Sequence, residues 1–303
     1  MSGGSSNGPD GARATDSGAS AACVACGGRR LSPFVRTPHF TLHLCATCDG
    51  LTALPRLPAS LLTTHHDSDE YFMHPYFERR RTQVTRAEAR CREVLARVRS
   101  VAPAFTPQGA RHLDVGCDTG IFMETFTRLN GTVGVGIDIA ARAVARARGR
   151  GLDVHHTDLE HAASLGDFDL ITMIDVIEHV PDPVALLRQA GARLRPGGVC
   201  YLETPNIRSS VYQIGRAISR TTGGRPAWLC ERLFLPEHVQ YFSERGLQFA
   251  GAAAGMRVRW VGRRPLGVAD VNSVVPVRIA VQTLQLADRL LSREILHCAV
   301  LTN

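Results

Sequence analysis

The chain has 303 residues, of which 44% are hydrophobic and 21% charged, and its formal net charge is +7. This length suits one large domain or a domain with a small module. No apolar run approaches the roughly 20 residues that a membrane-spanning helix needs. The sequence contains no lysine, which excludes Schiff-base and P-loop chemistry. The positive charge comes from arginines that are mostly scattered, so we expect no nucleic-acid partner.

Residues 1–20 are rich in Gly, Ser, Asp and Ala and lack the apolar core of a secretory signal. We therefore expect a disordered tail and a cytoplasmic protein. The nine cysteines are odd in number and irregularly spaced. This pattern favours a reducing compartment over a framework of disulfides.

A small module is predicted over residues 21–58, where Cys23 and Cys26 form one C-x2-C pair and Cys45 and Cys48 form another. Two such pairs can close a tetrahedron of thiolates around Zn²⁺. Because four thiolates leave no open coordination position, the zinc would be structural in a zinc-ribbon-like module. The alternative, a redox pair, fits two matched motifs poorly.

A linker and a helix follow over residues 59–104. Aromatic residues mark the linker, and apolar residues recur at helical spacing between about 79 and 100. The sequence VAPAFTPQG then ends the helix.

Strands and helices alternate in the next hundred residues, which predicts an α/β fold with a parallel sheet and helices on both faces. The expected strands span 111–117, 131–138, 152–156, 168–174 and 197–204. Asp182 and Pro183 begin the helix between the last two strands as N-cap and first-turn residue.

The remainder is less regular. Residues 205–240 form a mixed segment, and Ser243 is expected to cap a helix that follows it. Strands over 256–264 and 296–303 flank an amphipathic helix over 276–292, which is compatible with an antiparallel hairpin at the sheet edge.

Carboxylates follow three successive strands. Asp114 lies at the end of the first, with Gly116 and Gly120 in the turn behind it; Asp138 ends the second, and Asp158 follows the third. Glycines let a ligand approach the backbone, and a carboxylate at the second strand can accept ribose hydroxyls. Three acids at one sheet edge suit a cationic adenosyl ligand better than a pyrophosphate. The alternative is that they are ordinary helix caps.

The motifs LDVGCDTG, VGVGID, FDLITMIDVIEHVPDP and LRPGGVCYLETPN, in this order, resemble the class I S-adenosylmethionine-dependent methyltransferases. The resemblance implies a Rossmann-like seven-stranded sheet with the last strand antiparallel, in a domain over 105–303 with a lid-like segment at about 205–240. It implies that S-adenosylmethionine contacts Asp114, Gly116, Gly120, Asp138, Asp158, Leu159, Ile174 and Asp175. Asp118 stands where the family more often has glycine, and we expect Asp to tolerate the left-handed backbone there.

Asp175, Glu178 and His179 follow the fourth strand, and one helical turn would put them on one face. His238 is a candidate fourth member. Three interpretations remain open. His179 could act as a metal-free base with Glu178 and His238 beside it; all four residues could bind a divalent metal such as Mg²⁺, Mn²⁺ or Zn²⁺; or Glu178 and His179 could only hydrogen-bond the loop. The metal-binding set is similar to those of RNA 2′-O-methyltransferases and catechol-type O-methyltransferases.

The cysteine module and the sequence LPEHVQYFS look like a bacterial subgroup with a core similar to ubiquinone-pathway O-methyltransferases. The resemblance implies O-methylation of a small-molecule acceptor in a natural-product or cell-surface sugar pathway. C- or N-methylation, RNA 2′-O-methylation and a non-catalytic scaffold are the alternatives. Tyr212, Trp228, Phe234 and Tyr241 are candidates for an acceptor lid or, equally, for core positions.

Overall fold

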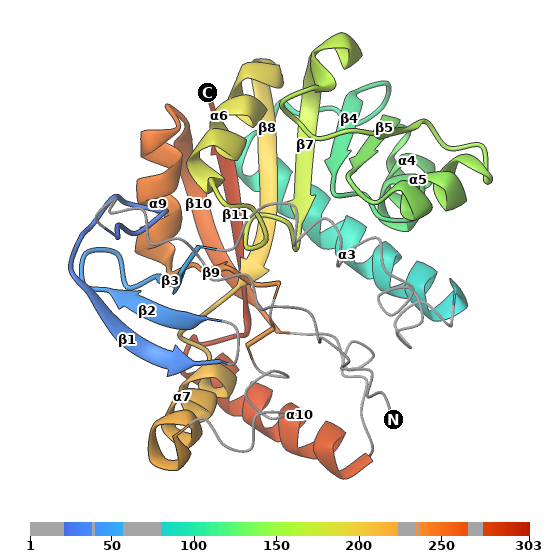
Figure 1. The fold of residues 1–303 in the computed structure, drawn as a ribbon. Helices are drawn as coiled ribbons and strands as arrows, with labels where there is room; N and C mark the ends of the chain where they lie inside the picture. Colours follow the sequence, from blue (N-terminus) through green and yellow to red (C-terminus); the bar gives the residue numbers. More distant parts are fainter. Residues whose placement is uncertain (1–20, 38–39, 57–79, 224–233, 236, 266–274) are drawn as a thin grey trace, which may run out of the picture.

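The computed structural model describes residues 21–37, 40–56, 80–223, 234–235, 237–265 and 275–303, with side chains described from 83 in the first long helix and from 283 in the last. These residues form a seven-stranded sheet and a smaller four-stranded sheet beside it (Figure 1). Within these ranges, no helix combines the length and apolar character that crossing a membrane requires. Trp228 and residues 1–20 and 57–79 lie outside the described ranges.

The large sheet has the order β10-β11-β8-β7-β4-β5-β6. All neighbouring strands from β8 to β6 pair in parallel, whereas β11 is antiparallel to both β8 and β10. This confirms the expected seven-stranded sheet with an antiparallel last strand. The strands are β4 (Arg111–Val115), β5 (Val133–Asp138), β6 (Val154–His156), β7 (Phe168–Ile174), β8 (Leu194–Pro205), β10 (Arg257–Arg264) and β11 (Leu296–Thr302).

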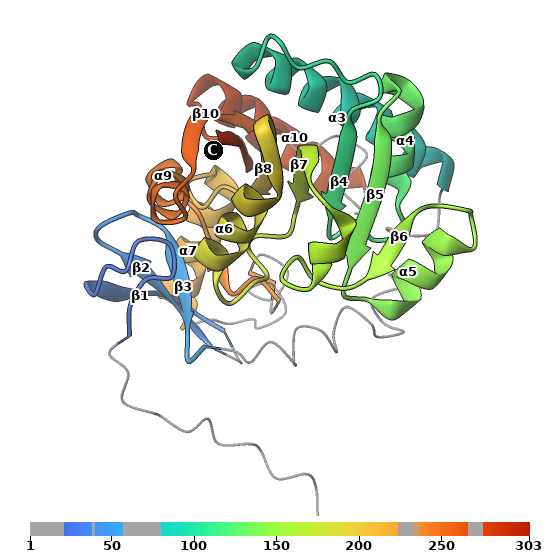
Figure 2. The same ribbon diagram turned by 90° about the horizontal axis from the view of Figure 1, so that it is seen from above.

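Helices cover both faces of this sheet, as the strand–helix alternation predicts (Figure 2). Helices α3 and α4 pack together on one face, while α6 and α9 pack together on the other. A short 3-10 turn, η2, precedes β7. The helices are α3 (Arg80–Val101), α4 (Ile121–Asn130), α5 (Ala141–Arg148), α6 (Pro183–Arg193), α7 (Ser210–Thr222), α9 (Glu244–Ala253) and α10 (Val275–Leu290), and η2 spans Ala162–Leu165.

Helix α3 is the N-terminal helix expected from apolar spacing. Its Cys91, Val94 and Val98 are fully buried against Tyr201 and Val300 of the sheet. These three residues lie three or four positions apart and therefore form one stripe. The helix thus belongs to the core of the large sheet although it precedes the first parallel strand.

The small sheet has the order β1-β2-β3-β9 and combines two distant parts of the chain. Strands β1 (Leu31–Arg36), β2 (Thr41–Cys45) and β3 (Leu51–Leu54) come from the cysteine module, and β9 (Gln240–Tyr241) comes from the segment before α9. Strands β1 and β2 pair antiparallel as a hairpin between the two cysteine pairs. The sequence does not predict β3 or β9, because each is too short to show alternation.

The segment predicted as irregular contains a full helix, α7, which packs against β1 and α10. Asp288 of α10 is completely buried and accepts hydrogen bonds from the backbone N–H and the hydroxyl of Ser210, at the start of α7. The expected C-terminal helix and hairpin are confirmed. Helices α7 and α10 together extend the molecule beyond the carboxyl edge of the large sheet (Figure 1).

Two N-caps expected from sequence are formed, and they allow a matched test. Asp182 is exposed and accepts from Ala185 N at 2.9 Å; Ser243 is buried, accepts from Gly246 N at 3.0 Å and also donates to the carbonyl of Cys48. We expect Asp182→Ala to lower the free energy of unfolding by about 1 kcal/mol. Ser243→Ala should lower the free energy of unfolding by about 2–3 kcal/mol, because it also removes the hydrogen bond to the buried carbonyl of Cys48. Urea unfolding of both variants measures the difference; equal losses would contradict a role for Ser243 in joining the two sheets.

Candidate functional site

The turn between β4 and α4 lies at the carboxyl edge of the large sheet. Gly116, Asp118 and Gly120 have φ values of 67°, 48° and 77°, all in the left-handed region. Asp118 tolerates this backbone as expected. Its N–H donates to Asp138 Oδ2 at 2.8 Å, so the end of β5 fixes the turn. Consecutive strands thus bring the predicted glycines and Asp138 together.

Asp114 lies beneath this turn and is 3% exposed. One of its oxygens accepts from the Thr172 hydroxyl at 2.6 Å, and that hydroxyl accepts in turn from His112 Nε2 at 2.8 Å. Burial raises the pKa of Asp114 to about 7, and it lowers the pKa of His112 to about 3. His112 is therefore a neutral donor at the base of the site.

The remaining carboxylates of the turn repel one another. Burial and then the charge of Asp138 raise the pKa of Asp118 to about 7, and burial raises the pKa of Asp138 as well. Asp138 also accepts from Ala140 N at 2.8 Å, a local contact that stabilises the turn before α5. Three partly desolvated carboxylates at one edge create a strong preference for a cationic ligand.

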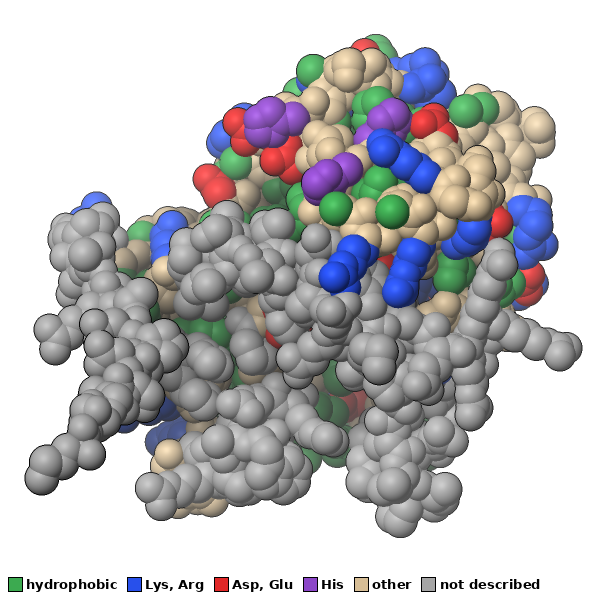
Figure 3. All heavy atoms as spheres, turned by 45° about the vertical axis from the view of Figure 1, so that its right-hand side comes forward, with side chains coloured by type: hydrophobic (Ala, Val, Ile, Leu, Met, Phe, Trp, Pro, Cys, Tyr) green, Lys and Arg blue, Asp and Glu red, His purple; other side chains and the backbone are tan. Residues whose placement is uncertain are grey.

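Asp158, Leu159 and Ile174 differ in their access to this edge. Asp158 is exposed, and its Oδ1 accepts from His161 N at 2.9 Å and lies 2.6 Å from His161 Nδ1, so it stabilises the local turn before η2. Leu159 is 2% exposed and packs in the main core. Ile174 is half-buried at the end of β7. Histidine and acidic side chains lie together on the face of the molecule seen in Figure 3.

The side chains of Glu178, His179 and His238 lie close together. Each offers one potential ligand atom, and these atoms all lie within 4.8 Å of one another. The two imidazole rings are 4.7 Å apart between centroids and meet edge to face. Glu178 is completely buried, and burial followed by the charge of Asp175 raises its pKa well above the usual range.

The backbone around His238 holds the loop that carries the other two residues. Val239 N donates to the carbonyl of Glu178 at 3.1 Å, and His179 Nδ1 lies 3.1 Å from the carbonyl of Glu237. The Gln240 side-chain amide donates to the carbonyls of Ile177 and Val180 at 2.5 and 2.8 Å. Sequence patterns do not reveal Gln240, because its role depends on a contact across about sixty residues of chain.

Asp175 does not join this group, which corrects the expected set of four metal ligands. Residues 175–180 form no helical turn, and Asp175 has a left-handed φ of 55°. Its Oδ2 lies 3.6 Å from Arg90 Nη1 of α3 instead. Asp175 directly follows the carboxyl end of β7.

Glu203 is a charged residue of this edge that the sequence analysis missed. It is completely buried at the end of β8, accepts from the Tyr201 hydroxyl at 2.7 Å, and lies 3.4 Å from Arg90 Nε and 3.5 Å from Arg264 Nη1. An acid at the end of a predicted strand is the same signal that marks Asp114 and Asp138. Arg90 therefore links α3 to the ends of β7 and β8.

The aromatic residues proposed for a lid are core residues where they are described. Tyr212, Phe234 and Tyr241 are at most 8% exposed and pack with Phe34 of the cysteine module. Ring centroids of neighbouring members are 5.2–6.5 Å apart. The core alternative therefore holds for these three side chains.

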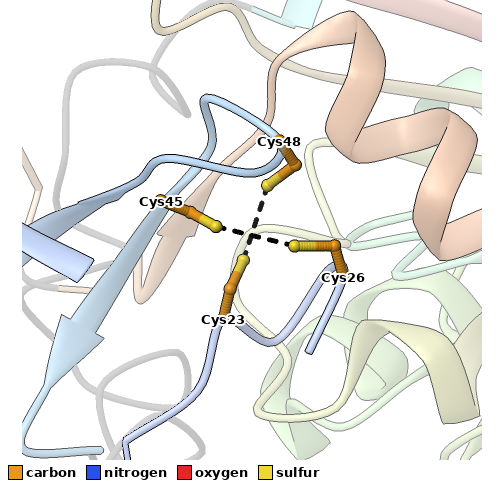
Figure 4. A group of neighbouring side chains, drawn as sticks. All are labelled: Cys23, Cys26, Cys45 and Cys48. Atoms are coloured by element: carbon orange, nitrogen blue, oxygen red, sulfur yellow. Dashed lines mark hydrogen bonds between the residues drawn. The ribbon is translucent and has the colours of Figure 1, made fainter. Parts of the chain in front are cut away.

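The four module cysteines point toward one centre (Figure 4). Cys23 Sγ and Cys48 Sγ are 3.5 Å apart, and Cys26 Sγ and Cys45 Sγ are 3.6 Å apart. Zn–S bonds of about 2.3 Å place tetrahedral sulfurs about 3.8 Å apart, so the group has the size of a zinc site. The N–H groups of Thr47 and Gly50 each donate to a module sulfur at 3.4 Å, as thiolate ligands require. The residues fit structural zinc.

Comparison with known proteins agrees with this geometry. Residues 84–259, more than half of the chain, match a family model described as a methyltransferase domain. A ubiquinone biosynthesis O-methyltransferase from Xanthomonas axonopodis pv. citri is 38% identical over 126 residues, which are 39% of this chain and 52% of that protein. One from Aromatoleum aromaticum is 35% identical over 112 residues, 34% of this chain and 47% of that protein. The chain thus spans about half the length of these relatives.

Two solved structures share the fold. An S-adenosylmethionine-dependent methyltransferase from Archaeoglobus fulgidus has a TM-score of 0.52 at 19% identity, covering 78% of this chain and all of that one. Magnesium protoporphyrin IX methyltransferase from Synechocystis, with bound S-adenosylhomocysteine, has a TM-score of 0.51 at 11% identity, covering 80% and 98%. The chain therefore belongs to the methyltransferase domain family, and its fold is that of a class I S-adenosylmethionine-dependent methyltransferase.

The raised pKa values predict a pH dependence of cofactor affinity. Asp118, with a pKa of about 7, is charged at pH 8 and largely neutral at pH 6, and S-adenosylmethionine is cationic. If that carboxyl must be charged in the complex, the Kd should rise about tenfold from pH 8 to pH 6. Calorimetric titration at both pH values measures this. Asp118→Asn should flatten the dependence, and an unchanged slope would contradict the assignment.

Deprotonation of Asp118 should strengthen cofactor binding but lower the stability of the cofactor-free protein. Because its folded pKa lies above the unfolded value of about 3.9, its stabilising contribution is present below pH ~4 and is lost as pH rises through ~7. Thermal melting of the wild type and Asp118→Asn from pH 5 to 8 should show the variant losing less stability as pH rises. An equal loss of stability in the two proteins over this pH range would refute the raised pKa of Asp118.

Zinc content tests the cysteine module. Cys26→Ser should lose the bound metal, because three thiolates and a hydroxyl bind Zn²⁺ far more weakly than four thiolates. Cys200→Ala, a buried thiol of the large sheet, should keep one zinc per chain. Atomic emission measures both. Equal zinc in Cys26→Ser and the wild type, or none in the wild type, would show that the module holds no zinc.

Proposed function

We propose that this protein transfers the methyl group of S-adenosylmethionine to a hydroxyl oxygen of a small-molecule acceptor. The observation that carries the proposal is the convergence of Glu178, His179 and His238 beside the acidic cofactor edge. The relatives named as ubiquinone biosynthesis O-methyltransferases support oxygen as the acceptor atom. A natural-product or cell-surface sugar pathway is our expectation for its setting.

The cofactor would lie across the ends of β4, β5 and β7. Asp138 would accept the ribose hydroxyls, and Asp114, Asp118 and Asp175 would surround the cationic end of the molecule. Exposed Gly116 lets the ligand approach the turn. When bound, the cofactor supplies a sulfonium-linked methyl group that an oxygen nucleophile can attack in line.

His179 is oriented to receive a proton or to bind a cation. Because a carbonyl oxygen can only accept, the Nδ1 of the neutral ring carries the hydrogen that faces Glu237 O at 3.1 Å. Nε2 is therefore the basic nitrogen. A fixed tautomer is what both a general base and a metal ligand require.

Glu178 favours the metal interpretation. Its Oε2 accepts from the Thr204 hydroxyl at 3.0 Å, while its Oε1 is buried and has no hydrogen-bond partner among the residues described. A buried carboxylate is costly unless a cation or donor compensates it. One carboxylate with two imidazoles suits Mn²⁺ or Zn²⁺ better than Mg²⁺, which prefers an oxygen shell. The metal would hold the acceptor hydroxyl and lower its pKa.

The zinc module supports this site rather than taking part in the chemistry. Four thiolates leave zinc no open position, whereas the pairing of β3 with β9 fixes the backbone next to His238. Thiolate ligands must stay reduced, so we expect the protein to act in the cytoplasm.

Metal binding at the cluster can be measured before the acceptor is known. Mn²⁺ titration followed by electron paramagnetic resonance should show one site in zinc-loaded wild type, weakened at least about tenfold in Glu178→Gln and His238→Ala. Asp158→Asn, which alters a carboxylate away from the cluster, is the control and should bind Mn²⁺ as the wild type does. Equal affinity in all four proteins would exclude the metal site.

Turnover with a panel of catechols and labelled cofactor then tests the reaction. Loss of activity after mild EDTA treatment, with recovery on adding Mn²⁺ or Zn²⁺, is the expected result. A different result would establish His179 as a metal-free base. In that case activity would survive EDTA treatment and the His238→Ala substitution but would be lost in His179→Ala. Full activity of His179→Ala would refute both mechanisms, and absence of cofactor binding in calorimetry would refute catalysis itself.

A further inference from the structure

A second hollow lies away from the acidic cofactor edge, where the cysteine module meets α7, the end of β10 and the turn between α10 and β11. Its volume is about 510 Å³, within the range of small-molecule sites. Strands β1 and β2 and the residues after β8 complete its wall. None of the residues predicted to contact the cofactor lines it, whereas four lining residues come from the segment 205–240 that was expected to form a lid. We refer to it as the arginine cleft.

The arginine cleft is strongly basic. Arg208, Arg216, Arg263 and Arg293 line it, and among its described lining residues Asp49 is the only acid. Ion pairs offset this charge only in part. Asp49 lies 2.9 Å from Arg208 and 3.7 Å from Arg245, and Glu244 lies 2.9 Å from Arg263. Among the described residues a positive excess remains in this concave surface, where charge attracts anions most effectively.

The side chain of Arg216 is ordered by packing against the protein. Its guanidinium carbon lies 4.4 Å from the centroid of the Phe34 ring, and its Nε is buried without a hydrogen-bond partner in the described part of the chain. A stacked guanidinium with an unused donor is already ordered, so it loses little entropy when it binds an oxyanion.

Beneath the arginines lies a buried histidine. His297 is directly opposite Arg263 in the β10–β11 pair, so the two side chains share one face of the sheet. It is 1% exposed, and neither ring nitrogen has a hydrogen-bond partner within the described ranges. Burial, followed by the nearby Arg263, lowers its pKa to about 3. His297 does not line the cleft itself, and its neutral ring adds no charge beside Arg263.

The rest of the wall is apolar. Phe34 and Ile207 are at most 4% exposed as side chains of the core, and Leu291 is 57% exposed. Ser292, between Leu291 and Arg293, has a left-handed φ of 50°, which is costly for a non-glycine residue. Arginine donors beside an apolar floor suit a ligand that joins a charged group to an organic body.

We propose that the arginine cleft binds a phosphorylated organic small molecule at a site separate from the cofactor edge. Arg208, Arg216 and Arg263 contact the phosphate oxygens through their terminal guanidinium nitrogens. The fork of each guanidinium matches a phosphate, which gives short charge-assisted hydrogen bonds. The organic body lies against Phe34 and Leu291.

Phenyl phosphate, inorganic phosphate and phenol are suitable probes for calorimetric titration at about 0.15 M ionic strength. We expect phenyl phosphate to bind at least about threefold more tightly than inorganic phosphate, and phenol not to bind. Arg216→Ala and Arg263→Ala should each weaken phenyl phosphate binding about tenfold. Arg220→Ala on α7 and Arg259→Ala on β10 are matched controls, because both are exposed arginines of the same elements outside the cleft. Cofactor affinity, measured for every variant, reports folding.

Failure of phenyl phosphate to bind the wild type would overturn the proposal. Equal weakening by control and cleft variants would also overturn it, because the attraction would then be diffuse charge. Competition between phenyl phosphate and S-adenosylmethionine would place the anion at the cofactor edge instead. Should Arg216→Ala fail to bind the cofactor, Arg216→Lys keeps the charge but loses the planar stack, and it should still weaken phosphate binding at least about threefold.

Discussion

The backbone pairing between β3 and β9 is the constraint on which the site depends. Thr52 pairs with Gln240, and Leu51 pairs with Tyr241. The residues next to them hold the loop of Glu178 and His179 through Val239 and the Gln240 amide. One short segment therefore lies between the cysteine module on one side and the polar cluster on the other. A module that appears separate in sequence is therefore joined to the polar cluster of the large domain through this segment.

Charge divides the carboxyl edge of the large sheet into distinct regions. Acids surround the turn after β4, and their raised pKa values show that burial works against their charge. Glu178 and the two histidines form a mixed cluster that can compensate a cation's charge and supply nitrogen ligands. Beyond them, the arginine cleft has the opposite sign. A cationic cofactor and an anionic ligand would thus be attracted to different ends of the same edge.

Much of this arrangement could be predicted from sequence because its causes are local or periodic. Buried strands appear as apolar runs, and parallel strands must end at one edge, so Asp114 and Asp138 could be placed together. The cysteine set was predictable because two turns bring their own ligands together. The conformation of Asp118 was predictable because few residues other than glycine adopt a left-handed backbone easily.

The rest depended on contacts between distant residues. Asp175 was expected on a helical turn with Glu178, but its left-handed backbone turns it toward Arg90. The sequence alone does not show whether Tyr212 and Tyr241 are core or surface residues. They are buried because the cysteine module packs against them. Strands β3 and β9 are too short to show an alternation of apolar and polar residues. Such features follow from tertiary packing, which overrides local preference.

The pairing of β3 with β9 also bears on the order in which a growing chain can acquire structure. The four cysteines lie within one short stretch, so metal could be bound soon after that stretch leaves the ribosome. The strand that completes the small sheet is synthesised about 190 residues later, which at typical speeds is a delay of roughly 10–40 s. During that interval the edge of β3 has no partner strand. An unpaired edge attracts other chains, so the period of synthesis is when this protein is most exposed to misassembly.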